Sequence, residues 1–269
     1  MDTAPLKASN RIMARFTHIQ LETVDALTRI QLARPDARNA LSSDLLKELS
    51  DALSHTHENK STRVVEISGA GVDFCAGFDL HHMSARVFSE GLDEALVRDL
   101  AEAGRTVIAQ ILALPSITVG VVQGHALGGG FLIAASCDLR VVSEDAHIAL
   151  PEVDLGMPLI WGGIPLLLRE FGPATVRDLV FTGRALDGSG TAFEGFASRT
   201  APSNALSEES ERLVGTLLAK PEQALSLLKQ QCIQEMRKGV ATREDEEQIA
   251  LDAILHPDFL ATVMRAIQR

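Results

Sequence analysis

Residues 124–157 read GHALGGGFLIAASCDLRVVSEDAHIALPEVDLGM. An apolar stretch precedes the glycines and the uncharged residues 129–137 follow them, which predicts a strand, a tight turn and a buried helix. Glycine lets the backbone of such a turn approach a ligand, and the first helical N–H groups are unpaired and carry the positive end of the helix dipole. The turn suits an anion or a developing oxyanion, although its spacing fits equally well a turn in which glycine only relieves crowding.

A second glycine-containing turn lies upstream, where residues 69–80 read GAGVDFCAGFDL after the apolar residues 64–68. Two turns that follow adjacent strands can present two backbone N–H groups toward one point, which is the geometry of an oxyanion hole. Taken by itself, this segment fits an ordinary surface loop better. The two turns together make an oxyanion hole a hypothesis for the structure to test.

Short β-type runs alternate with helix-period stretches and predict an α/β class. We expect strands at residues 30–32, 64–68, 118–122, 139–142 and 147–149, and helices at 43–55, 92–114, 206–219, 221–238, 242–255 and 257–268. Ser42 or Ser43 can cap the first helix. Strands are expected to cease after about residue 195, which divides the chain into a core of residues 1–195 and a helical region of residues 196–269. The first ten or so residues are expected to be a loose tail.

Composition excludes several classes of function. The 269 residues carry a net charge of −11 and are 46% hydrophobic, which is typical of a globular protein that binds neither nucleic acid nor an anionic membrane. The three cysteines, Cys75, Cys137 and Cys232, are an odd number and far apart, as in a reducing compartment, so a cytoplasmic location is expected. The sequence contains no nucleoside-triphosphate loop, no G-x-S-x-G elbow and no zinc-ligand spacing, and no metal is expected.

Four segments together resemble the crotonase superfamily, the enoyl-CoA hydratase and isomerase family. They are LARPDARNAL at residues 32–41, DFCAGFDL at 73–80, the signature at 124–157 and FTGRALDGSGTAFEGFAS at 181–198. The resemblance implies a spiral of ββα repeats with a C-terminal helical region that packs on neighbouring subunits, in a homotrimer or a dimer of trimers. It also implies an acyl-CoA substrate, with coenzyme A as part of the substrate and no separate cofactor.

The resemblance further implies site residues. The thioester oxygen would lie between the backbone N–H groups of Phe78 and Gly129, and the first loop would also line the coenzyme A site. The substrate-binding residues implied there are Ala76, Asp79, Leu80 and His81. Arg34 and Arg38 are possible phosphate contacts, although solvated surface arginines fit the sequence better.

Two glutamates serve the hydratases of this family, and only one is matched here. Leu132 stands where the first would be, and Glu152 stands in the place of the second. Addition of water needs both carboxylates, whereas movement of a double bond needs one base that takes and returns a proton. The chain therefore resembles the single-glutamate isomerases that convert 3-enoyl-CoA to 2-enoyl-CoA. Ile160 stands where some relatives carry a further aspartate. The apolar neighbours of Glu152 are expected to bury it and raise its pKa.

Alternatives remain open at this point. Asp154 or a histidine could replace the missing carboxylate in a hydratase or a CoA-ester hydrolase, and a non-catalytic acyl-CoA-binding scaffold would keep the fold without the reaction. Leu132 and Trp161 are candidates for the lining of the acyl pocket, and a packed loop fits Trp161 equally well. Cys75 and Cys137 are expected to be buried small apolar residues rather than nucleophiles.

Overall fold

The structure, a computed structural model, describes residues 11–81, 94–187 and 195–236. Its strands are β1 (Arg11–Arg15), β2 (Ile19–Val24), β3 (Leu27–Leu32), β4 (Val64–Gly69), β5 (Ile117–Val122), β6 (His125–Leu127), β7 (Leu139–Ser143), β8 (His147–Ala149), β9 (Ala185–Asp187) and β10 (Arg199–Ala201). Its α-helices are α1 (Ser43–Glu58), α3 (Glu94–Ala113), α4 (Gly129–Ala135), α5 (Gly163–Glu170), α6 (Pro173–Thr182), α7 (Leu206–Leu218) and α8 (Glu222–Met236). Short 3-10 helices are η1 (Pro35–Ala37), η2 (Pro151–Leu155) and η3 (Ser203–Ala205).

A seven-stranded sheet in the order β1-β2-β3-β4-β5-β7-β10 forms the centre of the molecule. The pairs β1·β2 and β2·β3 are antiparallel, and every later pair in this sheet is parallel. A second sheet in the order β6-β8-β9 adjoins it. Because strands β5 and β6 are separated only by Gln123 and Gly124, the chain passes directly from the large sheet into the small one.

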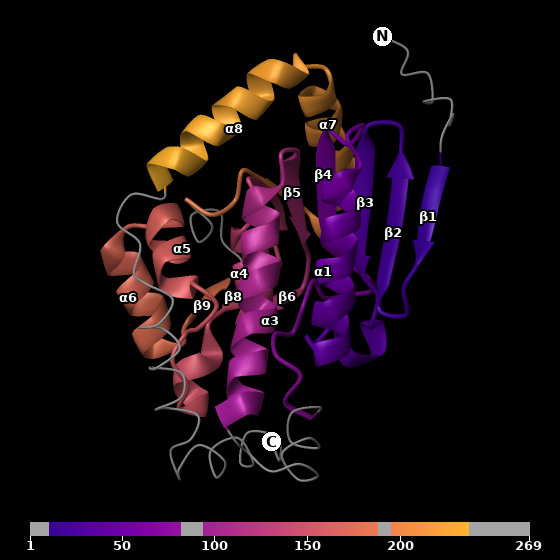
Figure 1. Cartoon of the computed structure of the whole chain (residues 1–269). Helices are drawn as coiled ribbons and strands as arrows, with labels where there is room; N and C mark the ends of the chain where they lie inside the picture. Colours follow the sequence, from indigo (N-terminus) through magenta and orange to yellow (C-terminus); the bar gives the residue numbers. More distant parts are fainter. Residues whose placement is uncertain (1–10, 82–93, 188–194, 237–269) are drawn as a thin grey trace.

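Both faces of the large sheet are covered, and α1 and α3 lie side by side on one of them (Figure 1). Successive residues of β4 show the division: Val65 packs into the core beneath α1 and α3, whereas Val64 packs into a second core. Leu213, Val214 and Leu217 of α7 contribute to that second core. Since side chains alternate along a strand, β5, which is buried throughout, reads as a short and nearly continuous apolar run, whereas β4 carries Glu66 on its second face.

Most expected elements that fall on the described residues are confirmed, and one expectation is wrong. All five expected strands are present, and Ser42 accepts a hydrogen bond from Leu45 N at 3.2 Å as the N-cap of α1. The expectation that strands cease after residue 195 is wrong, because β10 pairs in parallel with β7. Two of its three residues are exposed, so no apolar pattern marks it. The helices expected at 242–255 and 257–268 and the expected N-terminal tail lie outside the described residues.

Buried charges fasten the peripheral helices to this sheet. Lys229 of α8 donates from Nζ to Ser116 O and to Asp138 Oδ2, each at 2.7 Å, and is 6% exposed. Arg140 of β7 is 4% exposed and donates to Phe196 O and Cys137 O, each at 2.6 Å, as well as to the Glu170 carboxylate. Arg140 thereby ties the loop after α4 to the end of α5. No helix among the described residues is long and apolar enough to cross a membrane.

We expect Arg140→Met to destabilise the fold strongly. The variant leaves the Glu170 carboxylate partly buried without its cation and two carbonyls without a donor, and breaking a buried pair from one side costs about 3–5 kcal/mol. Arg184→Met, in an exposed pair with Asp178, should cost less than about 1 kcal/mol. Urea unfolding of both variants measures the difference, and equal losses would contradict the role given to Arg140.

Candidate functional site

The glycine turn before α4 has a backbone that only glycine adopts readily. Gly128 has φ 49° and ψ −116°, and α4 begins at the next residue, Gly129. A Cβ on Gly128 would lie 2.5 Å from Glu152 Oε1, and a Cβ on Gly130 would lie 2.6 Å from Cys75 O. The absence of side chains here therefore lets both a carboxylate and the first glycine loop approach the start of the helix.

The two glycine turns run side by side. Cys75 and Ala126 form a parallel bridge, with Cys75 N donating to His125 O at 2.9 Å and Leu127 N donating to Cys75 O at 3.0 Å. Phe78 and Gly129, whose amides the family resemblance implies as the oxyanion hole, each stand three residues further along from this bridge. Within the described residues, neither of these two N–H groups donates a hydrogen bond. An oxyanion hole formed by these two N–H groups stays a prediction.

The first loop is held by the chain that precedes α1. Leu41 N donates to Gly77 O at 2.8 Å, and Asp79 N donates to Leu41 O at 3.2 Å, so both neighbours of Phe78 are bonded while Phe78 N is not. Asn39, which is fully buried, donates from Nδ2 to Ala70 O at 2.9 Å and to Asp73 O at 2.8 Å. The loop is thus fixed before any ligand binds, as preorganised stabilisation of charge requires.

Asp73 links the same loop to the residues before α1 and to the second glycine turn. Asp73 accepts from Arg38 Nε at 2.7 Å and from the backbone N of His125 at 2.9 Å, and its Oδ1 lies 2.7 Å from His125 Nδ1. Burial alone would raise the pKa of Asp73, but the hydrogen bonds from Arg38 and His125 outweigh it and lower that pKa to about 2. Asp73 is therefore ionised at neutral pH and joins the two glycine turns.

Glu152 is the titratable group at the centre of this arrangement. It lies in η2 with Oε1 beside Gly128, and its Oε2 is fully shielded from solvent without a hydrogen-bond partner among the described residues. Burial raises the pKa of Glu152 to about 7, as its apolar neighbours predicted, although a backbone hydrogen bond opposes the shift. A carboxyl group with this pKa exchanges protons near neutral pH, which is the property of a general base.

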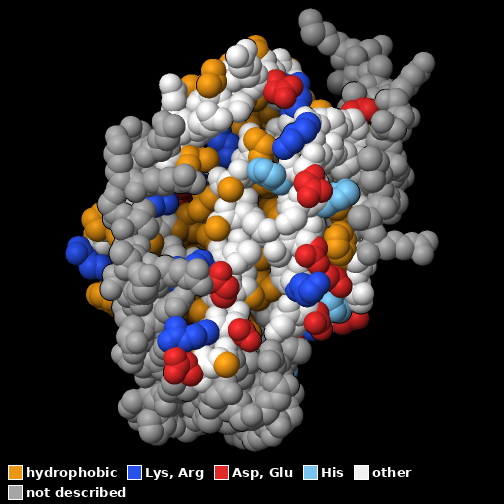
Figure 2. All heavy atoms as spheres, viewed as in Figure 1, with side chains coloured by type: hydrophobic (Ala, Val, Ile, Leu, Met, Phe, Trp, Pro, Cys, Tyr) orange, Lys and Arg blue, Asp and Glu red, His pale blue; other side chains and the backbone are white. Residues whose placement is uncertain are grey.

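Buried apolar side chains pack near the start of α4, where Glu152 Oε1 approaches Gly128. Leu132 and Trp161 are both buried, and a Cβ on Gly163 would lie 3.0 Å from Leu132 Cδ1. A Cβ on Gly129 would lie 2.3 Å from Trp161 Cζ3, so the indole touches the residue that supplies one of the two amides. Figure 2 shows apolar side chains gathered in the middle of the face that carries α3 and α5, with charged side chains around them.

Other residues singled out in the sequence lie further from Glu152 or are already engaged. Asp154 is exposed, and its Oδ2 lies beside Gly183 at the end of α6. Asp79 is buried and accepts from Arg34 Nη1 at 2.9 Å. Arg34 and Arg38 are thus both paired with carboxylates; Arg38 is exposed, as a surface arginine is expected to be, whereas Arg34 is partly buried.

The remaining residues of the first loop differ in exposure. Ala76 N donates to Arg38 O at 2.9 Å, Leu80 is partly buried and His81 is exposed. Their roles in binding a substrate stay predictions. Cys75 and Cys137 are buried as expected, and burial raises the pKa of both thiols to about 12, so neither is a thiolate at neutral pH.

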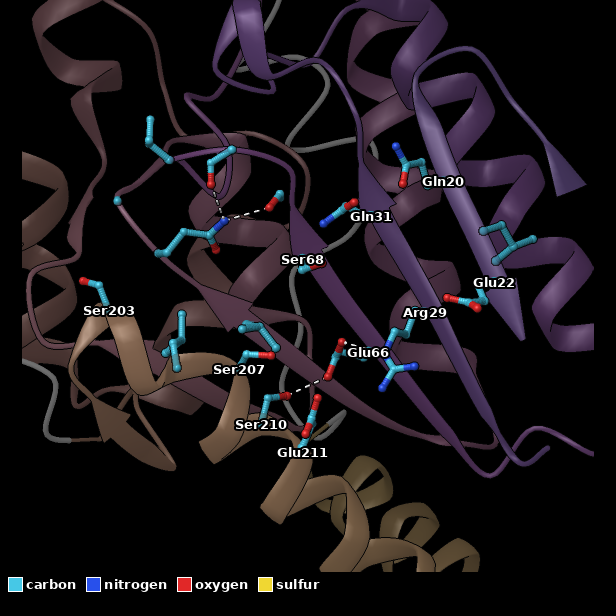
Figure 3. A pocket seen from close by; sticks show the side chains of 18 of the residues that line it. Gln20, Glu22, Arg29, Gln31, Glu66, Ser68, Ser203, Ser207, Ser210 and Glu211 are labelled. Atoms are coloured by element: carbon cyan, nitrogen blue, oxygen red, sulfur yellow. Dashed lines mark hydrogen bonds and ion pairs between the residues drawn. The ribbon is translucent and has the colours of Figure 1, made fainter. Parts of the chain in front are cut away.

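A polar cavity of about 740 Å³ lies elsewhere, between the other face of the large sheet and α7 (Figure 3). Its lining includes Arg29, whose Nε lies 3.3 Å from Glu66 Oε1, and Ser210, whose Oγ donates to Glu66 Oε2 at 2.6 Å. The lining contains none of Glu152, Leu132 and Trp161. The shielded carboxyl group and the two amides therefore define the candidate site.

Sequence reasoning missed two residues that shape this site. Asn39 was not singled out within residues 32–41, and only the structure shows its bonds to the first loop. Gly104 was also not singled out within the helix expected at 92–114, although the structure places it against the Trp161 ring. A glycine inside an apolar helix costs about 1 kcal/mol relative to alanine, so its presence was a signal that something packs there.

We expect Glu152→Gln to stabilise the protein at alkaline pH. Because the pKa of Glu152 is raised from 4.5 to about 7, the folded state holds the proton more tightly than the unfolded chain. This tighter proton binding stabilises the folded state by up to ~3 kcal/mol below pH 4.5, and the stabilisation is lost as pH rises through 7. Urea unfolding should show Glu152→Gln more stable than the natural protein at about pH 8 and nearly equal to it near pH 4.5.

The exposed neighbour provides the control for this measurement. Asp154→Asn removes a carboxyl group that lies two residues away but in solvent, and it should change stability little at either pH. A Glu152→Gln variant that gains nothing at alkaline pH would contradict the burial of this carboxyl group.

Comparisons with known proteins agree on one family. A family model described as "Enoyl-CoA hydratase/isomerase" matches residues 22–266. The crotonyl-CoA hydratase of Syntrophomonas wolfei is 29% identical over 215 residues, which are 80% of this chain and 80% of that protein. An enoyl-CoA hydratase/isomerase structure from Mycobacterium paratuberculosis superposes with a TM-score of 0.83 at 24% identity, over 93% of this chain and 98% of the other, and shows the same fold.

A further solved structure contains a ligand. It is a Thermobifida fusca protein in complex with acetoacetyl-CoA, 28% identical to this chain, with a TM-score of 0.73 over 88% of this chain and 94% of the other. The α/β class and the crotonase-like architecture expected from the sequence are confirmed. By its family match, its fold and its paired glycine turns, this chain belongs to the enoyl-CoA hydratase/isomerase family of the crotonase superfamily.

Proposed function

We propose that this protein is an enoyl-CoA isomerase that converts a 3-enoyl-CoA to a 2-enoyl-CoA. The single observation that carries the proposal is one shielded carboxyl group, Glu152, whose burial raises its pKa to about 7. Leu132, buried and apolar, stands where a hydratase of this family would carry its other glutamate. A thioester substrate also agrees with the acetoacetyl-CoA bound to the Thermobifida fusca relative.

The reaction needs one base and a site for negative charge. The thioester oxygen accepts hydrogen bonds from Phe78 N–H and Gly129 N–H, and Glu152 removes a proton from the α-carbon. The electron pair of that C–H bond forms a dienolate whose charge rests largely on the oxygen. The double bond moves to the α,β-position as the protonated Glu152 returns its proton to the γ-carbon. Each preorganised donor to such an oxyanion contributes about 3 kcal/mol.

The environment of Glu152 suits both halves of this cycle. A carboxylate with a pKa of about 7 is a stronger base than an ordinary glutamate, and once protonated it is still acidic enough to give the proton back. Its Oε2 has no partner among the described residues, so one oxygen is free to take the proton.

Hydration is the second candidate, because the Syntrophomonas wolfei relative is named as a hydratase. This reaction would need a second acid or base beside Glu152. Asp154 is the carboxylate nearest in sequence, but it is exposed beside Gly183 rather than Gly128. That position favours isomerisation over a hydratase or a hydrolase that uses Asp154.

Purified protein supplied with 3-butenoyl-CoA and, separately, with crotonyl-CoA in water tests the proposal. We expect crotonyl-CoA to form from the first thioester at least tenfold faster than 3-hydroxybutyryl-CoA forms from the second, as resolved by chromatography. Faster hydration would refute the isomerase assignment. Binding of both thioesters without any turnover would support a non-catalytic acyl-CoA-binding protein instead.

Glu152→Gln tests the role of the base. Removal of a general base lowers kcat by about 10²–10⁴-fold, whereas Asp154→Asn should retain nearly full activity. For the natural protein, kcat/KM should rise with pH and level off above about 7, because only ionised Glu152 accepts the proton. Retention of full activity in Glu152→Gln would overturn the assignment of Glu152.

A further inference from the structure

Trp161 has an unusual backbone and an unusual place. Its φ is +65°, in the left-handed region where a bulky residue is strained by roughly 1–3 kcal/mol, and the side chain is only 4% exposed. Such strain persists only where the surroundings fix the residue, and it is concentrated at functional sites. Gly162 follows with φ +73°, so the two residues turn the chain from the loop after η2 into α5.

The indole lies in a slot made by two glycines on different helices. A Cβ on Gly104 of α3 would lie 1.8 Å from Trp161 Cε2, and a Cβ on Gly129 of α4 would lie 2.3 Å from Cζ3. No other residue could stand at either position without moving the ring. The flat side of the indole therefore rests on α3 while its benzo edge abuts the start of α4.

A hydrogen bond fixes the ring in this slot. Trp161 Nε1 donates to Leu100 O at 3.2 Å. A helical side chain covers the turn that precedes it, so any side chain at position 104 would cover the carbonyl of Leu100, and glycine leaves that carbonyl open. Gly104 thus accommodates both the face of the indole and its hydrogen bond, at a cost of about 1 kcal/mol to the helix.

The indole of Trp161 lies near the residues proposed to bind and deprotonate the substrate. Glu152 Oε1 lies beside Gly128, and the benzo edge of Trp161 lies beside Gly129, the next residue in the chain. An acyl chain whose thioester oxygen is bound at Gly129 N–H and whose α-carbon faces Glu152 must extend past this edge. Since the ring is held at both ends, it closes the space that the distal carbons of a long acyl chain would need.

We propose that Trp161 limits the substrate to short acyl chains and that Gly104 is the residue that permits it. This inference rests on the proposed acyl-CoA site and names its substrate class. A protein interior is close-packed, so a ring that cannot move excludes added methylenes sharply. Each methylene that fits or fails to fit a pocket changes discrimination by about 10–200-fold.

Binding of saturated thioesters tests the inference without any turnover. We expect the natural protein to bind butyryl-CoA at least tenfold more tightly than octanoyl-CoA in calorimetric titrations, and Trp161→Ala to shift this ratio at least tenfold toward octanoyl-CoA. Trp161→Phe, which keeps more of the packing, should shift it in the same direction by a smaller factor. Leu53→Ala, a truncation in the buried face of α1, should lower stability but leave the ratio unchanged.

The fluorescence of the protein gives a second, variant-free measurement. Trp161 is the only tryptophan in the chain, so the tryptophan emission reports on the surroundings of this indole alone. Butyryl-CoA should change the emission of the natural protein, whereas coenzyme A without an acyl group should change it much less.

The outcomes separate the two proposals. If the natural protein binds butyryl-CoA but binds octanoyl-CoA equally well, or if the Trp161 variants keep the natural ratio, the role of Trp161 is refuted while the acyl-CoA site stands. Tight butyryl-CoA binding with unchanged emission would refute the role as well. If neither thioester binds, the proposed function fails and the inference fails with it.

Discussion

The parallel pairing of Cys75 with Ala126 is the contact on which the site depends. It aligns two turns that follow neighbouring strands of one sheet, and equal steps along both turns lead to Phe78 and Gly129. The oxyanion hole proposed at these two amides depends on this register, because both positions are counted from the same bridge. Gly77 and Gly130 allow the pairing, since a Cβ at either would lie within 2.7 Å of an atom of the facing segment, whereas a Cβ on Gly128 would meet Glu152 Oε1 at 2.5 Å.

Hydrogen bonds from polar side chains support this pairing. Asn39 bridges to the first turn, and Asp73 accepts from Arg38 on one side and from His125 on the other. Buried polar groups that are fully bonded rigidify the segments they join. Leu132 and Trp161, by contrast, are buried apolar side chains beside Gly163 and Gly129. Burial raises the pKa of Glu152 to about 7.

Glycine has two different roles in this molecule. At Gly128 it supplies a left-handed backbone and room for the Glu152 carboxylate. At Gly104 the backbone is helical, and glycine only makes room for the Trp161 ring. The first role belongs to a motif of consecutive residues. The second role joins Gly104 and Trp161, which are far apart in the sequence. A glycine weakens a helix, and a bulky residue with a left-handed backbone is strained, so each residue by itself lowers stability.

The sequence by itself determined the α/β class, the two glycine turns and the burial of Cys75 and Cys137, which follow from patterns within a few residues, where periodicity and glycine spacing act locally. Glu152 became the candidate base through the resemblance of the signature segment to the crotonase superfamily. Only the tertiary structure decided that β10 joins the large sheet, that Arg34 and Arg38 pair with Asp79 and Asp73, and that Trp161 fits against Gly104. Those contacts join segments distant in the chain, and packing between such segments is set by the whole fold rather than by any local run of residues.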